Sequence, residues 1–114
     1  MPVVDAARPE RSEASPAPVV YEVENSMTES LRFHGYRDER LCCRFRTPEQ
    51  GLKREDVILE IDGMEQPVLF LTDLGDGGWQ TNSRFPQGLA SGAHRVRLRT
   101  VRSSFSSATE VFSE

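Results

Sequence analysis

Apolar and polar residues alternate in several short runs along the chain, and a period of two predicts β-strands with one buried face. The clearest run covers residues 79–85, where Trp79 and Phe85 lie on one face and polar residues occupy the other. A second run follows at residues 95–100, with aliphatic residues on one face and arginines on the other. Seven strands are predicted in this way, at residues 19–24, 40–46, 56–61, 66–72, 79–85, 95–100 and 105–112.

Turn signals between these runs indicate how the strands connect. Asp62 and Gly63 form a reversal signal. Pro86 removes a backbone donor and ends its strand, and the glycines after it predict a wide corner that crosses between two sheets. Short strands at intervals of about ten residues, with no long amphipathic helix, predict an all-β sandwich of two antiparallel sheets. Its core is expected to contain seven inward side chains, Leu41, Phe45, Leu59, Trp79, Phe85, Val96 and Leu98.

The first part of the chain is less clearly patterned. The run at residues 19–24 places Val19, Tyr21 and Val23 on one face of a half-buried strand. Residues 25–39 have apolar residues at a spacing that fits either a strand or a helix, and both interpretations stay open there.

One of the seven strands is expected at a sheet edge. Pro67 lies within residues 66–72 and lacks the backbone N–H that a central strand needs. Val68 and Phe70 give this edge an apolar character, and residues 73–78 (D-L-G-D-G-G) predict a loop after it.

The second half of the chain resembles a known family. The run F-P-Q-G-L-A-S-G-A-H-R-V-R-L-R is preceded by W-Q-T-N, and D-V-I-L-E-I-D-G lies upstream. This succession is similar to the second half of an immunoglobulin-like domain of the IPT/TIG (early-set) type, over residues 57–111. The resemblance implies an immunoglobulin-like β-sandwich with a mainly structural role, and it carries no functional residues over to this chain.

Composition bounds the domain organisation and the partners. A chain of 114 residues with 37% hydrophobic content fits one domain at residues 19–114, after a flexible tail or linker at residues 1–18 that is rich in Ala, Pro, Glu and Ser. The net charge of −4 argues against nucleic acid as a partner. No apolar run predicts a membrane span or a secretory signal, so a complete chain is expected in the cytoplasm; for a fragment the location stays open.

Two groups of residues are candidates for ligand binding, and each group also has a purely structural interpretation. Trp79 and Tyr36 are candidate aromatic platforms for a glycan, but a lone tryptophan at the start of an inward row is more often part of the core. A candidate anion-binding row consists of Arg95, Arg97 and Arg99. Carboxylates are expected beside some of the arginines of the outer faces: Glu60 beside Arg97, and Glu22 and Glu24 beside Arg44 and Arg46. Cross-strand ion pairs on a solvated face are the favoured explanation of these rows, but Arg95 and Arg99 have no carboxylate expected beside them.

No catalytic, metal or cofactor site is predicted. The adjacent cysteines Cys42 and Cys43 fit neither a zinc site nor a redox pair and are expected to be free thiols. Asp73 and the glycine-rich loop after it lack calcium-loop spacing. His34 and His94 have no ligand-spaced neighbours and are interpreted as surface or capping residues. The chain is therefore not expected to be an enzyme or to need a cofactor.

The leading hypothesis is a non-catalytic accessory or interaction module, which contacts a protein partner or its own copy through the edge strand at residues 66–72 or acts as a spacer. The alternative is a carbohydrate-binding accessory domain associated with a sugar-active enzyme. A third class, a small enzyme, would need a pocket that joins His34 or His94 to a carboxylate.

Overall fold

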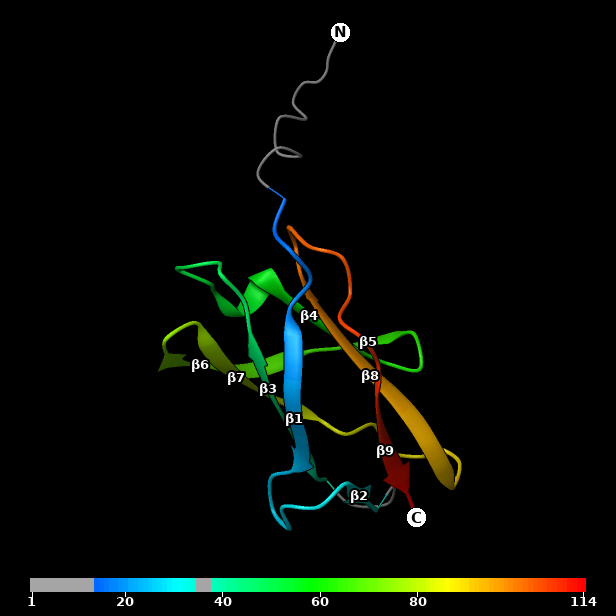
Figure 1. Ribbon diagram of the computed structural model, residues 1–114. Coiled ribbons are helices and arrows are strands. Elements are labelled where there is room, and N and C mark those ends of the chain that lie inside the picture. The colour runs from blue at the N-terminus through cyan, green and yellow to red at the C-terminus, as the bar shows by residue number, and fades with distance from the viewer. Residues whose placement is uncertain (1–13, 35–37) are drawn as a thin grey trace, which may run out of the picture.

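The computed structural model of the chain describes residues 14–34 and 38–114 and shows two β-sheets packed face to face (Figure 1). In the order of its strands, the first sheet contains β1 (Val19–Asn25), β3 (Arg40–Arg46), β7 (Gly78–Arg84) and β6 (Val68–Gly75). The second contains β2 (Arg32–Phe33), β9 (Thr109–Ser113), β8 (Gly92–Thr100), β4 (Val57–Ile61) and β5 (Met64–Gln66). A 3-10 turn, η2 (Arg54–Asp56), precedes β4.

The strand order is that of an immunoglobulin sandwich. In that fold, strands A, B, E and D form one sheet and strands C, F and G form the other. Here β1, β3, β7 and β6 take the first set of positions, and β4, β8 and β9 take the second. β5 extends the second sheet beyond β4, and β2 pairs in parallel with β9 at the opposite edge. The predicted all-β sandwich is confirmed, and the structure adds the short strands β2 and β5 to the seven predicted.

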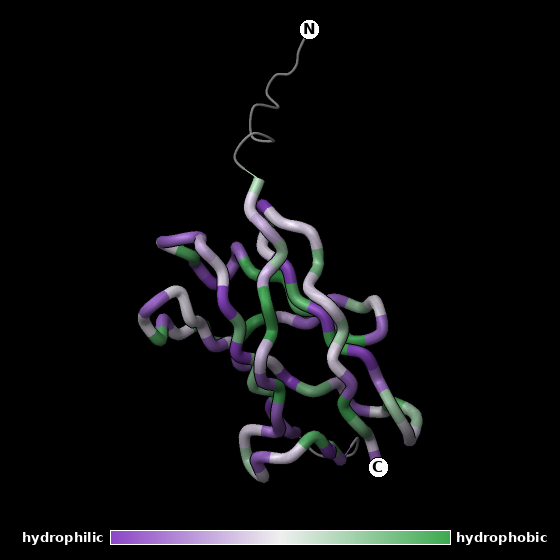
Figure 2. Tube along the Cα trace, viewed as in Figure 1, coloured by the Kyte–Doolittle hydropathy of each residue, from purple (hydrophilic) through white to green (hydrophobic). Residues whose placement is uncertain are grey.

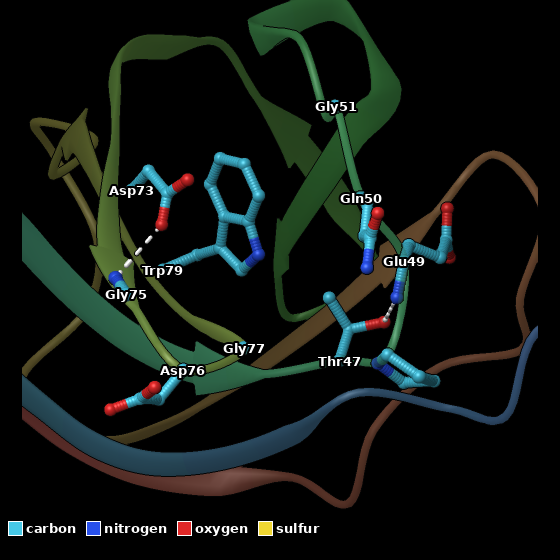
Figure 3. Close-up of a pocket in the computed structure, with 10 residues that line it drawn as sticks. Thr47, Glu49, Gln50, Gly51, Asp73, Gly75, Asp76, Gly77 and Trp79 are labelled. Carbon is cyan, nitrogen blue, oxygen red and sulfur yellow. Dashed lines mark hydrogen bonds between the residues drawn. The ribbon is translucent and has the colours of Figure 1, made fainter.

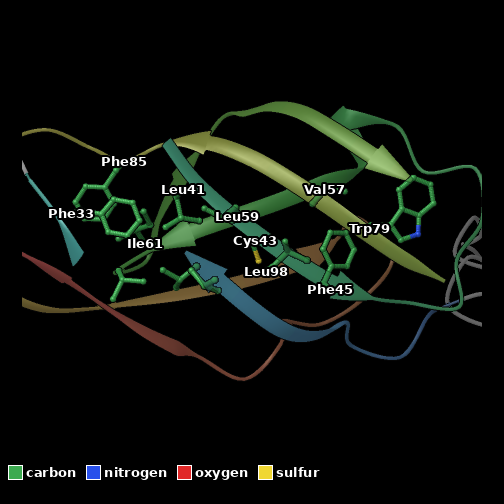
Figure 4. Close-up of a cluster of buried hydrophobic side chains, with 13 residues drawn as sticks. Phe33, Leu41, Cys43, Phe45, Val57, Leu59, Ile61, Trp79, Phe85 and Leu98 are labelled. Atoms are coloured by element: carbon green, nitrogen blue, oxygen red, sulfur yellow. The ribbon is translucent and has the colours of Figure 1, made fainter. Parts of the chain in front are cut away.

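The core lies between the sheets and contains every side chain predicted for it. All seven predicted side chains are at most 7% exposed. Phe33 joins them and stacks on Phe85, with ring centroids 4.2 Å apart, at one end of the cluster; Trp79 lies at the other end (Figure 4). Hydrophobic stretches alternate with hydrophilic ones along the strands (Figure 2). Burial of each large apolar side chain stabilises the fold by about 1.5–3 kcal/mol.

The predicted alternation in β1 is wrong at its start. Val23 is buried, but Val19 and Tyr21, predicted on the same face, are 63% and 49% exposed. The pairing of β1 with β3 shifts register between Val20 and Glu22. A bulge of this kind adds one residue to the strand and exchanges its faces, so Val20 packs against the core instead.

Two predicted connections are confirmed. The corner between β7 and β8 crosses from one sheet to the other, because the two strands belong to different sheets. Asp62 and Gly63 form the turn of the β4–β5 hairpin, with φ angles of 53° and 83°. Both angles lie in the left-handed region, which a tight hairpin of this type requires and which glycine adopts without a steric cost.

The structure corrects the edge strand predicted at residues 66–72. Pro67 separates two strands: β5 ends at Gln66 on the edge of one sheet, and β6 begins at Val68 on the edge of the other. The edge position is therefore confirmed, but the single strand is not. The predicted loop at residues 73–78 is also shorter than expected, because β6 continues to Gly75 and β7 begins at Gly78.

The segment at residues 25–39 contains a turn and a two-residue strand in its described part. The buried side chain of Asn25 accepts a hydrogen bond from the backbone N–H of Met27 at 2.9 Å and donates one to the carbonyl of Arg32 at 3.1 Å. The Asn25 side chain thus closes the turn that leads into β2.

Only the end of the predicted tail at residues 1–18 lies in the described part of the chain. There the backbone N–H of Ser15 donates to the carbonyl of Arg102 at 3.0 Å, and Pro18 is buried. Among the described residues, none of the helical segments has the length and apolar character needed to cross a bilayer.

Candidate functional site

The predicted binding residues do not form one site. Trp79 points inward from β7 and is 7% exposed, so the interpretation as a core residue is confirmed. Tyr36 lies outside the described residues. Arg95, Arg97 and Arg99 belong to β8 in the other sheet, and their alternation with buried residues places them on its outer face.

The predicted ion pairs form at Arg97 and Arg44, whereas Arg46 instead donates to the carbonyl of Asp76 at 2.9 Å. Glu60 lies opposite Arg97, with 2.7 Å between its Oε1 and the Nη2 of Arg97. Arg44 donates to Glu22 at 2.6 Å and to Glu24 at 3.4 Å. The hydrogen bond to Glu22 raises the pKa of Arg44. Pairs of this kind on a solvated face stabilise by only about 0.2–1 kcal/mol each.

Phe105 adds a feature to the arginine row that the sequence did not indicate. The guanidinium carbon of Arg97 lies 4.0 Å from the centroid of the Phe105 ring, and that of Arg99 lies 5.5 Å from it. Arg99 also donates to the carbonyl of Thr100 at 3.0 Å. These contacts occupy two of the three arginines, while Arg95 is exposed opposite Glu110 of β9.

His94 is buried, so its interpretation as a surface residue is wrong. Its Nδ1 lies 2.5 Å from Oδ2 of Asp62, and its Nε2 lies 2.7 Å from the carbonyl oxygen of Ala90. Asp62 also accepts the backbone N–H of Arg95 at 2.9 Å. The hydrogen bond to Asp62 raises the pKa of His94, against the opposing effect of burial. The Arg95 N–H, followed by His94, lowers the pKa of Asp62.

His34 lies between two carboxylates. Its backbone N–H donates to Oε1 of Glu39 at 2.7 Å, and its Nδ1 lies 3.2 Å from Oε2 of the same residue. Its Nε2 lies 3.2 Å from Oε1 of Glu114. Burial favours a higher pKa for Glu39, but the hydrogen bonds from His34 outweigh it and lower the pKa overall. Both histidines of the chain therefore have both ring nitrogens engaged.

Cys42 and Cys43 are free thiols, as predicted, and both are buried. Burial raises the pKa of Cys43 to about 12 and also raises that of Cys42. The thiolate is the nucleophilic form of cysteine. Neither side chain is therefore poised for attack on a substrate or for metal binding at neutral pH. Among residues 14–34 and 38–114, no three His, Cys, Asp or Glu side chains are grouped to hold a metal ion.

A pocket of about 490 Å³ opens at the Trp79 end of the core (Figure 3). Two loops form it: the segment after β3, and the tip of the β6–β7 hairpin. Its lining includes polar side chains on both sides of the indole, with Asp73 on the hairpin side and Gln50 on the other. Sequence patterns missed this pocket because residues 47–51 and 73–77 meet only through the pairing of β3, β7 and β6.

The outer edge of β6 is the second candidate interaction surface. β6 pairs only with β7, so the backbone groups along its other side have no strand partner among the described residues. Phe70 is 62% exposed and Leu74 is 45% exposed along this strand. Arg54 donates to the carbonyl of Leu69 at 3.2 Å, and beyond that point the edge combines a backbone without a strand partner with exposed apolar side chains, as strand addition by a partner requires.

Comparison with known protein families and with curated proteins finds no match to this chain.

Proposed function

We propose that this chain is a non-catalytic immunoglobulin-like module of the IPT/TIG (early-set) type that contacts a protein partner, or its own copy, through the free edge of β6. The immunoglobulin strand order and the motifs of the second half support the type. The main support for the proposed interaction is that β6 is the longest of the four sheet edges and exposes apolar side chains.

Three of the four described sheet edges carry features that hinder strand addition. β2 and β5 contain two and three residues, too few for an extended ladder. β1 has a bulge, and Glu22 and Glu24 on it are paired with Arg44. Short edges, bulges and charged residues are the usual protection against edge-to-edge pairing.

β6 has register shifts against β7 near both of its ends, between Val68 and Phe70 and between Asp73 and Gly75, but its pairing is regular from Phe70 to Asp73. It contains eight residues, has no lysine or arginine, and carries its one charge, Asp73, near its end. Pro67 precedes the strand and removes a backbone donor only at that point. The regular stretch from Phe70 to Asp73 leaves main-chain donors and acceptors to pair with an added strand, while Phe70 and the adjoining Leu74 supply apolar contacts.

The first experiment tests whether the chain pairs with its own copy through the edge of β6. We expect light scattering after size-exclusion chromatography to show a dimer that the variant with both Phe70→Lys and Leu74→Lys cannot form, because two like charges would face each other across the paired edges. The matched control is Met64→Lys, since Met64 is 51% exposed on the β5 edge. A wild-type chain that stays monomeric at high concentration would remove the homodimer and leave only a different partner.

A second candidate is a carbohydrate-binding accessory domain, and one observation favours it. Trp79 lines a pocket together with carboxylate and amide side chains, a combination that suits hydroxylated ligands. The proposed mode differs from a flat stacking platform, because only a small part of the buried Trp79 side chain reaches the surface. Binding of any glycan to the intact chain on an array would support this candidate, and a complete absence of binding would remove it.

A further inference from the structure

The indole nitrogen of Trp79 has no hydrogen-bond acceptor among the described residues. The side chain is more than nine-tenths buried. Its N–H still reaches solvent, since the fully buried side-chain polar atoms that lack a partner belong to other residues. Trp79 lines the pocket, and in Figure 3 its nitrogen lies on the side of the ring that faces Gln50. A largely buried tryptophan N–H normally finds an acceptor. Here the acceptor has to come from whatever enters the pocket.

The rest of the lining selects the charge of the ligand. Three acidic residues line the pocket, Glu49, Asp73 and Asp76, and none of the lining residues is Lys, Arg or His. Oδ1 of Asp73 accepts the backbone N–H of Gly75 at 2.8 Å, and its other oxygen, which has no donor among the described residues, is available to a ligand. The carboxylate of Glu49 accepts the hydroxyl of Thr100 at 2.5 Å. This surrounding repels phosphate, sulfate and uronic acid groups.

The donors and acceptors on the protein select the ligand's chemistry. The Trp79 N–H requires an acceptor, whereas Asp73 requires a donor. An ammonium group satisfies the carboxylate but offers no lone pair to the indole. A hydroxyl group both donates and accepts, so a saccharide that extends across the pocket can offer one oxygen to the indole N–H and a second hydroxyl to Asp73 on the other side of the indole. The volume of about 490 Å³ lies within the range of small-molecule sites, about 300–1,000 Å³.

We propose that the pocket between residues 47–51 and the β6–β7 hairpin binds the end of a neutral saccharide, with the Trp79 N–H donating to a sugar oxygen and Asp73 accepting a sugar hydroxyl. This proposal rests on the second candidate function and names its ligand class and its site. The recognition is by hydrogen bonds at the edge of the indole, not by stacking on its face.

Trp79 provides a direct readout, because it is the single tryptophan of the chain and gives one indole N–H signal in a ¹H–¹⁵N spectrum. The full chain is titrated with glucose, galactose, mannose, xylose, N-acetylglucosamine and their short oligomers. Binding by at least one of them at millimolar concentration is expected to shift the Trp79 indole signal, together with the backbone signals of residues 47–51 and 73–77. Glucuronic acid is the comparison probe for a charged sugar, and tetra-alanine is the comparison probe for a peptide.

Two isosteric variants test the assigned acceptor. Asp73→Asn keeps the oxygen that accepts the Gly75 N–H but removes the charge, and it is expected to weaken saccharide binding about tenfold. Asp38→Asn is the isosteric control, because Asp38 does not line the pocket and its side chain is 56% exposed beside Arg84; its affinity is expected to stay within about twofold of the wild type.

Each other outcome overturns the proposal in a distinct way. Loss of affinity that is equal in Asp73→Asn and Asp38→Asn would remove Asp73 as the acceptor. Binding of glucuronic acid alone, with shifts at Arg95–Arg99, would move the site to β8 but leave a glycan-binding function in place. An indole shift with tetra-alanine and with no sugar would replace the ligand class by a peptide. No shift with any probe would show that only water completes the Trp79 hydrogen bond.

Discussion

Replacement of Phe85 by alanine is expected to lower the free energy of unfolding by about 3–5 kcal/mol. Phe85 is 2% exposed, and its ring stacks on Phe33 at 4.2 Å with an interplanar angle of 10°. The substitution removes this contact and leaves a cavity between the sheets, which the surrounding strands close only in part. Urea denaturation, followed by circular dichroism, measures the change.

Phe70→Ala is the matched control for this prediction. It removes the same side chain from the surface of β6, where Phe70 is 62% exposed, and its effect is expected to stay within about 0.5 kcal/mol. A mild effect at Phe85, similar to that at Phe70, would contradict the placement of Phe85 in the core. A large effect at Phe70 would mean that β6 is covered in solution, which would itself support contact with a partner.

The parts of the fold that sequence patterns predicted are those in which each strand obeys a strict alternation. Leu98 could be placed on the inner face because arginines flank it on both sides, and Leu59 because it shares a period of two with Val57 and Ile61. The pairing of Glu60 with Arg97 follows from that placement, since opposite charges on adjacent strands favour the register that brings them together. Pro86 also marked the sheet crossing correctly, because its missing donor interrupts any ladder.

The features that were missed depend on contacts that alternation does not encode. The bulge near Tyr21 exchanges the faces of β1, and nothing in its apolar residues marks the extra position. The parallel pairing of β2 with β9 joins segments about 80 residues apart and involves only two residues of β2. Pro67 was recognised as a strand disruptor, but the sequence did not show that the chain changes sheets there.

The candidate sites were predicted less well than the core. The burial of Trp79 was predicted, but the pocket beside its N–H was not. Two loops build that pocket, and they share only their position at one end of the sandwich. The burial of His94 was missed for a similar reason. Its two partners are Asp62, in the hairpin turn of β4 and β5, and the carbonyl of Ala90, which no side-chain pattern reveals.

The His94 contacts favour the charged imidazolium. Both of its partners, a carboxylate and a carbonyl, are acceptors, and only the protonated ring donates from both nitrogens. The pKa of His94 is raised above its usual value of about 6.5, so its contribution to stability is complete below that pH and is lost as the pH rises through the higher folded-state pKa. The pKa of Asp62 is lowered below about 3.8, so its contribution is lost only as the pH falls through that lower value.

His94→Gln is therefore expected to destabilise the protein most between about pH 4 and pH 6.5, where both partners carry their charges. We expect a loss of about 1.5–3 kcal/mol in that window, the usual contribution of a hydrogen bond to a charged group. The loss should shrink as the pH rises above the folded-state pKa of His94, because the wild type then loses the same charge. Urea denaturation of the wild type and the variant at several pH values gives the difference between their free energies of unfolding. Groups that titrate alike in both proteins cancel from this difference. A difference that stays constant with pH would show that His94 contributes through packing alone and is neutral in the folded state.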